Sequence, residues 1–290
     1  YFLRFMDARN DKEFASMESM KYWGQVDWYN GGMEHTARHL LYARFWVQFL
    51  HNIGLVPKSE MIDTRVSHGM VLGSDNQKMS KSKGNVINPD DIVSEFGADT
   101  LRVYEMFMGD YTCDAPWSTD SLRGCKRFID KIIRLKDKVV SGDEYTKSLE
   151  ALINKSIKKI GYDLVNMAYN TAVSTLMILA NAYDDCDSIT KKDYETLLIL
   201  LNPIAPHITE ELNEALGNKP IVEQSWPEYD EEKTIDEEKE IGVQVNGKLR
   251  ATIKVNINDS EEMLKEKALA EENVKKFTEG KEIIKVIAIK

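Results

Sequence analysis

The stretch Lys78-Met79-Ser80-Lys81-Ser82, continued by Lys83-Gly84-Asn85, is the most informative part of this chain. We call residues 78–85 the lysine loop. Its lysines can neutralise an anion, its serine hydroxyls can donate hydrogen bonds, and its glycine lets the backbone approach a ligand closely. These are the properties that a loop needs to meet the triphosphate of a nucleotide. We therefore expect a flexible cationic hairpin that faces an anionic ligand.

The segments on either side of the lysine loop predict strands that alternate with helices. Residues 33–53 carry apolar side chains at helical spacing and stop at Gly54, and residues 64–72 alternate as a strand does. Asn88 is a good N-cap for a helix with Pro89 at its first position. This alternation predicts part of an open parallel sheet, in which ligands lie beyond the carboxyl ends of the strands.

The rest of the chain predicts a helical bundle and a small terminal domain. Apolar residues recur at three- and four-residue spacing from 118 to about 216, which indicates long helices with short connections. After an acidic stretch the pattern is strand, turn, strand, helix and strand, over residues 241–245, 246–247, 249–255, 261–278 and 283–289. The turn is Asn-Gly, a strong hairpin signal.

We therefore expect an α/β part, an all-α part and a small α+β part. The α/β segment would span residues 1–117, the helical bundle 118–226, an acidic linker 227–240, and a β-β-α-β domain 241–290. At 290 residues the chain is long enough for more than one cooperative unit.

Composition narrows the class of protein without fixing its partner. Hydrophobic content of 42% and charged content of 30% are typical of globular proteins, and no apolar run is long enough to cross a bilayer. Cys113, Cys125 and Cys186 are too far apart for a zinc ribbon or a disulfide framework, which fits a reducing cytosol. The net charge of -10 argues weakly against nucleic acid, but much of the acid lies within residues 228–240.

A second constellation is Gly31-Gly32-Met33-Glu34-His35, followed by His39 one helical turn later. On one helix the two histidines would share a face and could bind a metal. However, the order Glu-His-x-x-x-His differs from the His-Glu-x-x-His of metalloprotease helices, and no third ligand is near. A core-facing pair and a contact to substrate are the other interpretations. The two glycines are a suitable approach for a nucleotide at a helix N-terminus.

Together these residues resemble a known family. The lysine loop is the signature loop of class I aminoacyl-tRNA synthetases, and residues 69–72, 85–93, 31–35 and 244–250 resemble the leucine-specific branch of that family. The resemblance implies a partial Rossmann-like catalytic segment, an anticodon-binding-type bundle and a terminal domain that contacts tRNA. It implies a cytoplasmic enzyme that uses ATP, with Mg²⁺, to convert leucine to leucyl-adenylate and then transfers leucyl to leucine tRNA.

The resemblance also implies roles for individual residues. Lys78 and Lys81 would contact the phosphates of ATP and stabilise the departing pyrophosphate as the catalytic pair. The nucleotide would further be bound by Met79, Ser80, Ser82, Gly32 and Glu34, and the leucine pocket would be lined by Tyr1, His35 and His39. The tRNA would be contacted by Arg127, Lys248 and Arg250. No residue is assigned as a metal ligand.

Other parts of the family pattern are missing. No His-x-Gly-His sequence occurs, and no insertion resembles the editing domain of these enzymes. We therefore expect a fragment that forms no leucyl-adenylate alone and that pairs with an N-terminal catalytic half, on the same or a separate chain. The alternatives are a tRNA-binding module without catalysis and a fragment of an isoleucine, valine or methionine enzyme.

Several aromatic and basic residues have simpler interpretations. We expect Trp46 and Phe49 to lie in a core. Trp117 is expected to pack at the junction of the first segment with the bundle, and His207 is expected to be buried and hydrogen-bonded. Basic residues recur at helical spacing at the start of the bundle, where one face meets either phosphates or solvent: Arg123, Lys126, Arg127, Lys131, Arg134 and Lys136.

Overall fold

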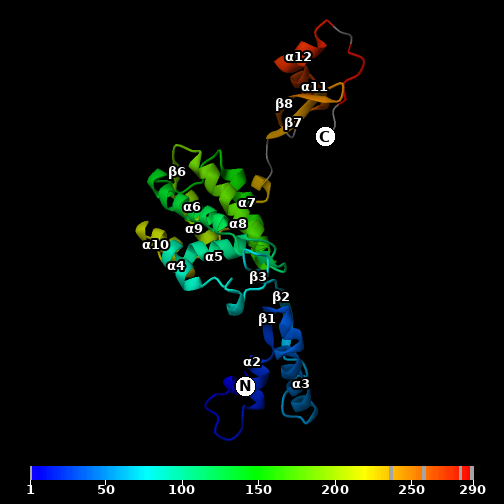
Figure 1. Ribbon diagram of the computed structural model, residues 1–290. Coiled ribbons are helices and arrows are strands. Elements are labelled where there is room, and N and C mark those ends of the chain that lie inside the picture. The colour runs from blue at the N-terminus through cyan, green and yellow to red at the C-terminus, as the bar shows by residue number, and fades with distance from the viewer. Residues whose placement is uncertain (1, 235–237, 257–258, 281–282, 288–290) are drawn as a thin grey trace.

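The computed structural model describes residues 2–234, 238–256, 259–280 and 283–287. Figure 1 shows three bodies along the chain: a small N-terminal body, a large helical bundle and a small C-terminal domain. Most described residues in regular structure are helical, and the sheets are small. Within the described part of the chain, every helix is too short or too polar to cross a membrane.

The N-terminal body is built around a strand-helix-strand unit. Strands β1 (Val26–Gly32) and β2 (Ile62–His68) pair in parallel, and the crossover between them carries the short 3-10 helix η1 (Met33–Ala37) and helix α3 (His39–Asn52). The parallel pairing that the sequence predicts is confirmed. Helices α1 (Phe2–Phe5) and α2 (Met17–Trp23) help to cover a small core made of Ala15, Met20, Ala43, Val47, Val56 and Met61.

Two predictions for this body are wrong. The expected helix 33–53 is broken at Arg38, whose φ of -122° and ψ of -101° are not helical. Trp46 and Phe49 are not in a core, because their side chains are 55% and 45% exposed. The inner face of α3 uses the smaller Ala43 and Val47, so its aromatic residues are on the outside.

The expected strand 64–72 is divided between two sheets. Strand β2 ends at His68, and strand β3 (Val71–Leu72) pairs in parallel with β4 (Ala115–Pro116). The chain changes sheets at Gly69, whose amide donates to the Tyr111 carbonyl at 2.9 Å. A Cβ atom at this glycine would collide with the Cys113 carbonyl. The crossing therefore requires glycine for space, not for an unusual φ angle.

The helix start after the lysine loop is as predicted. In α4 (Pro89–Phe96), Pro89 occupies the first position and the Asn88 side chain accepts from the Asp90 amide at 3.2 Å. Helix α5 (Ala98–Phe107) follows directly and packs against the bundle.

The bundle holds the largest core of the described residues. Its helices are α6 (Thr119–Leu135), α7 (Glu150–Val165), α8 (Tyr169–Asp184), α9 (Lys191–Leu201) and α10 (Pro206–Ala215). Short 3-10 turns and strands connect or follow them: η3 (Lys136–Lys138), β5 (Val139–Val140), β6 (Ile189–Thr190), η4 (Ile221–Glu223) and η5 (Glu232–Thr234).

Trp117 and His207 lie at the junctions of the bundle. Trp117 is buried edge-on against Tyr104, with 4.8 Å between ring centroids, so the prediction that it packs this junction is confirmed. His207 is hydrogen-bonded to Asp99, as expected, but the prediction that it is buried is wrong because its side chain is 72% exposed.

The acidic stretch before the C-terminal domain contacts the bundle. The Asp230 amide donates to Asn154 Oδ1 at 2.7 Å, and Lys233 pairs with Glu150 at 2.6 Å. Strand β7 (Glu238–Val245) begins inside the expected linker 227–240. The division of the chain into four domains stays a prediction.

The C-terminal domain follows its predicted order only in part. Strands β7 and β8 (Lys248–Asn256) form an antiparallel hairpin, with positive φ at Asn246 and Gly247 as the Asn-Gly signal predicts. The expected helix 261–278 is broken at Glu271 into α11 (Glu261–Ala270) and α12 (Glu272–Thr278). Residues 283–287 form no strand, so that prediction is wrong for the described residues; 288–289 lie outside them.

Candidate functional site

The carboxyl ends of β1 and β2 define the edge where the predicted nucleotide residues gather. Gly31 pairs with Ser67 and Gly32 with His68, so both strands end at the same level. Glu34 follows at once, in η1. A Cβ atom at Gly32 would overlap the Glu34 carboxyl group, which shows how closely backbone and carboxylate approach. In an open parallel sheet, this edge is where ligands bind.

The lysine loop reaches this edge through Lys78. The pKa of the Glu34 carboxyl is lowered first by a hydrogen bond from its own backbone amide, and then by the charges of Lys78, His35 and His68. Charges from three segments (the lysine loop, η1 and the end of β2) therefore act on one exposed carboxylate. Gly32 and Glu34 lie in contact, and the charge of Lys78 acts on the Glu34 carboxylate; sequence analysis assigned all three residues to one ligand.

The lysine loop itself is a short ordered turn. It contains η2 (Lys81–Lys83), which ends at Gly84, whose φ of 67° is left-handed. The hydroxyls of Ser80 and Ser82 are 2.8 Å apart. Met79 packs on the bundle core through its side chain.

Lys78, Lys81 and Lys83 are all exposed, but their side chains differ in what they contact. The side chain of neither Lys78 nor Lys81 makes an ion pair or a hydrogen bond with the part of the chain that the structure describes. Lys83, in contrast, donates to Gln77 Oε1 at 2.7 Å. Lys83 therefore stabilises the loop itself, whereas the side chains of Lys78 and Lys81 are available to a ligand.

The two histidines lie beside the same edge. His35 is in η1 and His39 begins α3, yet their rings are edge-on with centroids 6.3 Å apart. The hydroxyl of Tyr29 is 3.0 Å from His39 Nδ1, and Tyr42 packs against the His39 ring. Nδ1 of His35 is buried and has no hydrogen-bond partner among the described residues. The pair is close, as expected, although it does not lie on one helix.

These histidines are not part of a larger donor group. Across residues 2–234, 238–256, 259–280 and 283–287, no cluster of three or more His, Cys, Asp or Glu side chains is arranged to hold a metal ion. The metalloprotease interpretation therefore has no additional ligand in the described structure.

The remaining predicted residues do not join this site. Tyr1 lies outside the described residues. Arg127 is exposed on α6 and Lys248 is exposed at the hairpin of the C-terminal domain, so both belong to other bodies of the molecule (Figure 1). The Arg250 guanidinium lies 3.9 Å from the centre of the Phe277 ring, with Nε buried and unpaired among the described residues.

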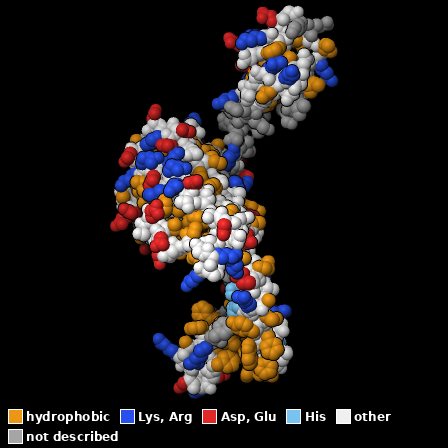
Figure 2. Space-filling view, viewed as in Figure 1, with side chains coloured by type: hydrophobic (Ala, Val, Ile, Leu, Met, Phe, Trp, Pro, Cys, Tyr) orange, Lys and Arg blue, Asp and Glu red, His pale blue; other side chains and the backbone are white. Residues whose placement is uncertain are grey.

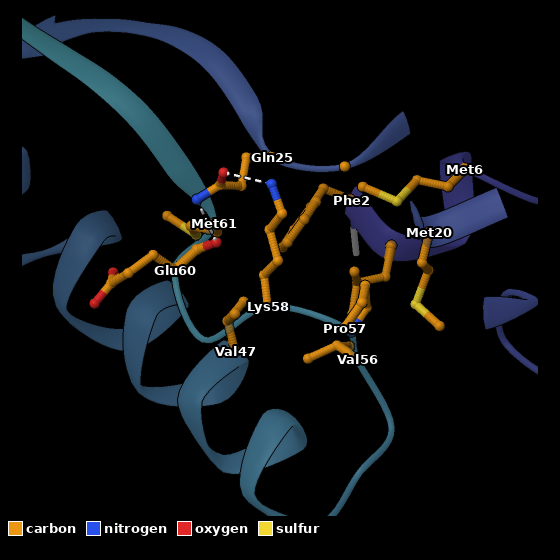
Figure 3. A pocket seen from close by; sticks show the side chains of 12 residues that line it. Phe2, Met6, Met20, Gln25, Val47, Val56, Pro57, Lys58, Glu60 and Met61 are labelled. Carbon is orange, nitrogen blue, oxygen red and sulfur yellow. Dashed lines mark hydrogen bonds between the residues drawn. The ribbon is translucent and has the colours of Figure 1, made fainter. Parts of the chain in front are cut away.

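A small cavity in the N-terminal body is not a nucleotide site. Figure 3 shows its walls, which include Phe2, Met20 and Pro57, and the hydrogen bond of 2.9 Å from Lys58 to Gln25. Its volume of about 30 Å³ is far too small for a nucleotide. It is a packing gap between α1, α2 and α3.

Sequence analysis missed three residues that shape the site. His68 ends β2 beside Glu34, while Asp75 and Asn85 close the lysine loop from both sides. A signal existed for the last two, since Ser-Asp-Asn favours a turn and Asn directly after Gly84 favours a side chain that bonds to backbone. For His68 the signal is only its position at a strand end.

Comparison with known proteins supports the family resemblance seen in the sequence. Residues 32–118 match the model of tRNA synthetases class I (I, L, M and V), and residues 146–267 match the anticodon-binding domain of tRNA ligase. The chain belongs to the class I aminoacyl-tRNA synthetases, and the expected resemblance is confirmed.

Within that class the chain is similar to leucine–tRNA ligases. It is 51% identical over 290 residues to the leucine–tRNA ligase of Alkaliphilus oremlandii, and it spans 36% of the length of that relative. It also resembles LeuRS in the ternary complex of Agrobacterium radiobacter K84 LeuRS, tRNA and LeuAMS. There the identity is 28% and the TM-score 0.75, over 96% of this chain and 38% of that one.

A more distant neighbour shares the fold alone. Mycobacterium tuberculosis methionyl-tRNA synthetase in complex with methionyl-adenylate is 16% identical, with a TM-score of 0.52, over 74% of this chain and 49% of that one. The fold class expected from sequence is therefore supported at the level of a class I synthetase fold.

Proposed function

We propose that this chain supplies the triphosphate-binding loop and tRNA-contacting surfaces of a leucine–tRNA ligase. The observation that carries the proposal is the position of Glu34 at the carboxyl ends of β1 and β2, where the charge of Lys78 from the lysine loop acts on its carboxylate. A carboxylate beside an unpaired lysine suits a nucleotide, since the acid can accept from ribose hydroxyls while the lysine meets phosphate.

The proposed reaction has two steps. The carboxylate of leucine attacks the α-phosphate of ATP, the bond to the β-phosphate breaks, and pyrophosphate leaves as leucyl-adenylate forms. Lys78 and Lys81 neutralise the charge that develops on the departing pyrophosphate. Leucyl then passes from the adenylate to the terminal ribose of leucine tRNA, with release of AMP.

The remaining site roles belong to the same proposal. His35 and His39, beside Tyr29 and Tyr42, would line the leucine pocket. Gly32, Met79, Ser80 and Ser82 would complete the nucleotide contacts. Mg²⁺ would arrive with the triphosphate, and no residue is proposed to ligate it directly because the described residues form no donor cluster. A cytoplasmic location stays a prediction.

The basic face of α6 is the proposed first contact for tRNA. Figure 2 shows Lys and Arg side chains gathered over this helix. Arg123 pairs with Asp120 and Lys131 pairs with Asp184, whereas Arg127 and Arg134 have no ion pair within the described part of the chain. A phosphate backbone could therefore engage Arg127 without breaking an internal pair.

The C-terminal hairpin is the proposed second contact for tRNA. Lys248 is exposed at its tip. Arg250 is stacked on Phe277, which would hold its guanidinium in one orientation.

An apolar face on the N-terminal body is proposed to receive the remaining catalytic half. Figure 2 shows hydrophobic side chains gathered over α3. The exposed members on this helix and just after it are Leu41, Tyr42, Phe45, Trp46, Phe49 and Ile53. A contiguous surface of this kind marks an interface. The relatives are far longer than this chain, which supports a further part of the catalytic domain as its occupant.

Calorimetric titration with ATP and with pyrophosphate tests the nucleotide site. We expect binding by the chain and about tenfold weaker binding by Lys81→Ala, because a charge-assisted contact to phosphate is lost. Lys147→Ala removes an exposed lysine of the bundle and serves as the matched control. A chain that binds tRNA but neither ATP nor pyrophosphate would instead be a tRNA-binding module. We further expect no leucine-dependent pyrophosphate exchange by the chain alone.

A further inference from the structure

We infer that Asp75 and Asn85 are positioning residues that close the lysine loop and hold Lys78 and Lys81 toward the phosphates. The inference rests on the proposed function, because it takes the lysine loop to be the phosphate-binding element. Neither side chain needs to touch the ligand for this role.

Asn85 joins both arms of the loop through one amide group. Its Oδ1 accepts from the Ser80 amide at 2.8 Å, and its Nδ2 donates to the two carboxylate oxygens of Asp75 at 3.1 and 3.2 Å. The Lys78 carbonyl lies 3.5 Å from the same Nδ2. A side-chain amide has both a donor and an acceptor, whereas a carboxylate has only acceptors and alanine has neither, so aspartate or alanine at 85 cannot make both contacts.

Asp75, the partner of Asn85, is itself held in place by hydrogen bonds within the turn. Its Oδ1 accepts from the Gln77 amide at 3.1 Å, and the Gly73 amide donates to the Gln77 carbonyl at 2.8 Å across the turn. The pKa of Asp75 is lowered first by the bond from Gln77 and further by Asn85 and the charge of Lys83. The carboxylate is thus held ionised, in the form that accepts from both neighbours.

Gly73 shows how tightly the pair is packed. This glycine is buried, and a Cβ atom there would lie 2.6 Å from Asp75 Oδ1 and 3.0 Å from Asn85 Nδ2. The pair therefore fills the space under the turn, with no room for a side chain beneath it.

The division of labour among the lysines agrees with this role. The Lys83 side chain bonds to Gln77 and so helps to close the turn, whereas the side chains of Lys78 and Lys81 make no ion pair or hydrogen bond within the described residues. Asn85, which Asp75 holds in place, fixes the backbone at Ser80, between the two ligand-facing lysines. If Asn85 released Ser80, the spacing of these lysines would no longer be set before the ligand arrives.

The test compares Asn85→Asp, Asp75→Asn and the double swap in the full chain. In Asn85→Asp two carboxylates face each other and the donor is lost. In the swap, the new amide at 75 can donate to the new carboxylate at 85, which still accepts from Ser80. The swap keeps the net charge of the wild type. Asp91→Asn, at an exposed position of α4, controls for the loss of one acidic charge.

Two measurements separate this inference from the proposed function. Trypsin cleavage after Lys78, Lys81 and Lys83, followed by mass spectrometry, reports the order of the loop without any ligand. We expect about tenfold faster cleavage and about tenfold weaker pyrophosphate binding in Asn85→Asp, with both recovered to within about twofold in the swap. Circular dichroism confirms that each variant is folded.

The outcomes distinguish the two ideas. If a folded swap is as defective as Asn85→Asp, or if Asn85→Asp is cleaved and binds like the wild type, the positioning role is wrong. If the wild type fails to bind pyrophosphate while cleavage follows the expected order, the proposed function is wrong and the loop-closing contact stands.

Discussion

Asp99 Oδ1 accepts a hydrogen bond from His207 Nδ1 at 2.7 Å, which joins the start of α5 to the start of α10. The second carboxylate oxygen of Asp99 accepts from the Ile208 amide, also at 2.7 Å. Nearby, Arg102 donates to the Ile204 carbonyl at 2.8 Å. Helices α4 and α5 follow the lysine loop in the chain. These contacts therefore attach the helices on the C-terminal side of the loop to the bundle.

Asp99→Ala should therefore destabilise the chain more than His207→Ala. Asp99 is buried, and its removal leaves the Ile208 amide without a partner, at a cost of about 1–3 kcal/mol. His207 is largely exposed, so water can replace its contact and the expected loss is below about 1 kcal/mol. Chemical denaturation of both variants measures the difference, and equal losses would show that the Ile208 contact contributes nothing.

Gly69→Ala should disrupt the passage from β2 to β3. The new methyl group would meet the Cys113 carbonyl, and overpacking of this kind costs about 1–3 kcal/mol. Gly109→Ala is the matched control, since its Cβ would lie 3.7 Å from the Ala115 side chain, an ordinary contact. Thermal unfolding should show a lower midpoint for Gly69→Ala alone. Similar midpoints for both variants would mean that the strand junction relaxes without cost.

The cysteines should differ sharply in reactivity. Burial raises the pKa of the Cys125 thiol to about 11, so almost none is thiolate at pH 8 and reagents cannot reach it. Cys113 is exposed and should react first. Labelling with iodoacetamide followed by peptide mapping measures the order. Modification of Cys125 at the rate of Cys113 in the folded chain would contradict the packing of α6.

Acid should weaken the C-terminal domain through Asp259. The Lys267 side chain and then the Asn256 amide lower the pKa of Asp259 below its usual value. The group binds its proton more readily when unfolded, so its stabilising effect is complete above about pH 4 and is lost as pH falls through the folded pKa. Lys267→Met should raise the Asp259 pKa in a carboxyl NMR titration. An unchanged pKa would show that the 2.6 Å pair does not persist in solution.

The sequence predicted correctly those elements whose structure is set by residues close together in the chain. The Asn88 cap, the Asn246-Gly247 hairpin and the bundle helices formed as expected because each is fixed by backbone preferences or by helical periodicity. The lysine loop was located from its residue types together with their resemblance to a family signature. Its closure by Asp75 and Asn85 was not predicted, because side-chain contacts ten positions apart leave no periodic trace.

The wrong predictions concerned tertiary contacts, namely which segment packs on a helix face and which strand pairs with which. Trp46 and Phe49 have the sequence pattern of core residues. However, the residues that α3 contributes to the core are Ala43 and Val47, on its other side. Likewise, the alternation of residues 64–72 could not show that Gly69 moves the chain into a second sheet. Periodicity identifies an apolar face but not the partner that packs on it.

That outer face of α3 leads to the last prediction. Trp46, Phe49 and their apolar neighbours are exposed together, and such a patch binds hydrophobic dyes and promotes association. We expect the chain to bind ANS and to self-associate with rising concentration in sedimentation velocity. Trp46→Ser with Phe49→Ser should reduce both effects by at least about twofold. Val222→Ser, at a single exposed position beyond the bundle helices, should change neither.

The same pair of substitutions tests what the face is for. If it receives a further part of the catalytic domain, a polypeptide with the part of the Alkaliphilus relative outside its match to this chain should suppress ANS binding by the wild type. The doubly substituted chain should compete poorly for that polypeptide, because the lost aromatic area is part of the contact. A wild-type chain that binds no dye, or whose association is unchanged by the substitutions, would show that another surface is the interface.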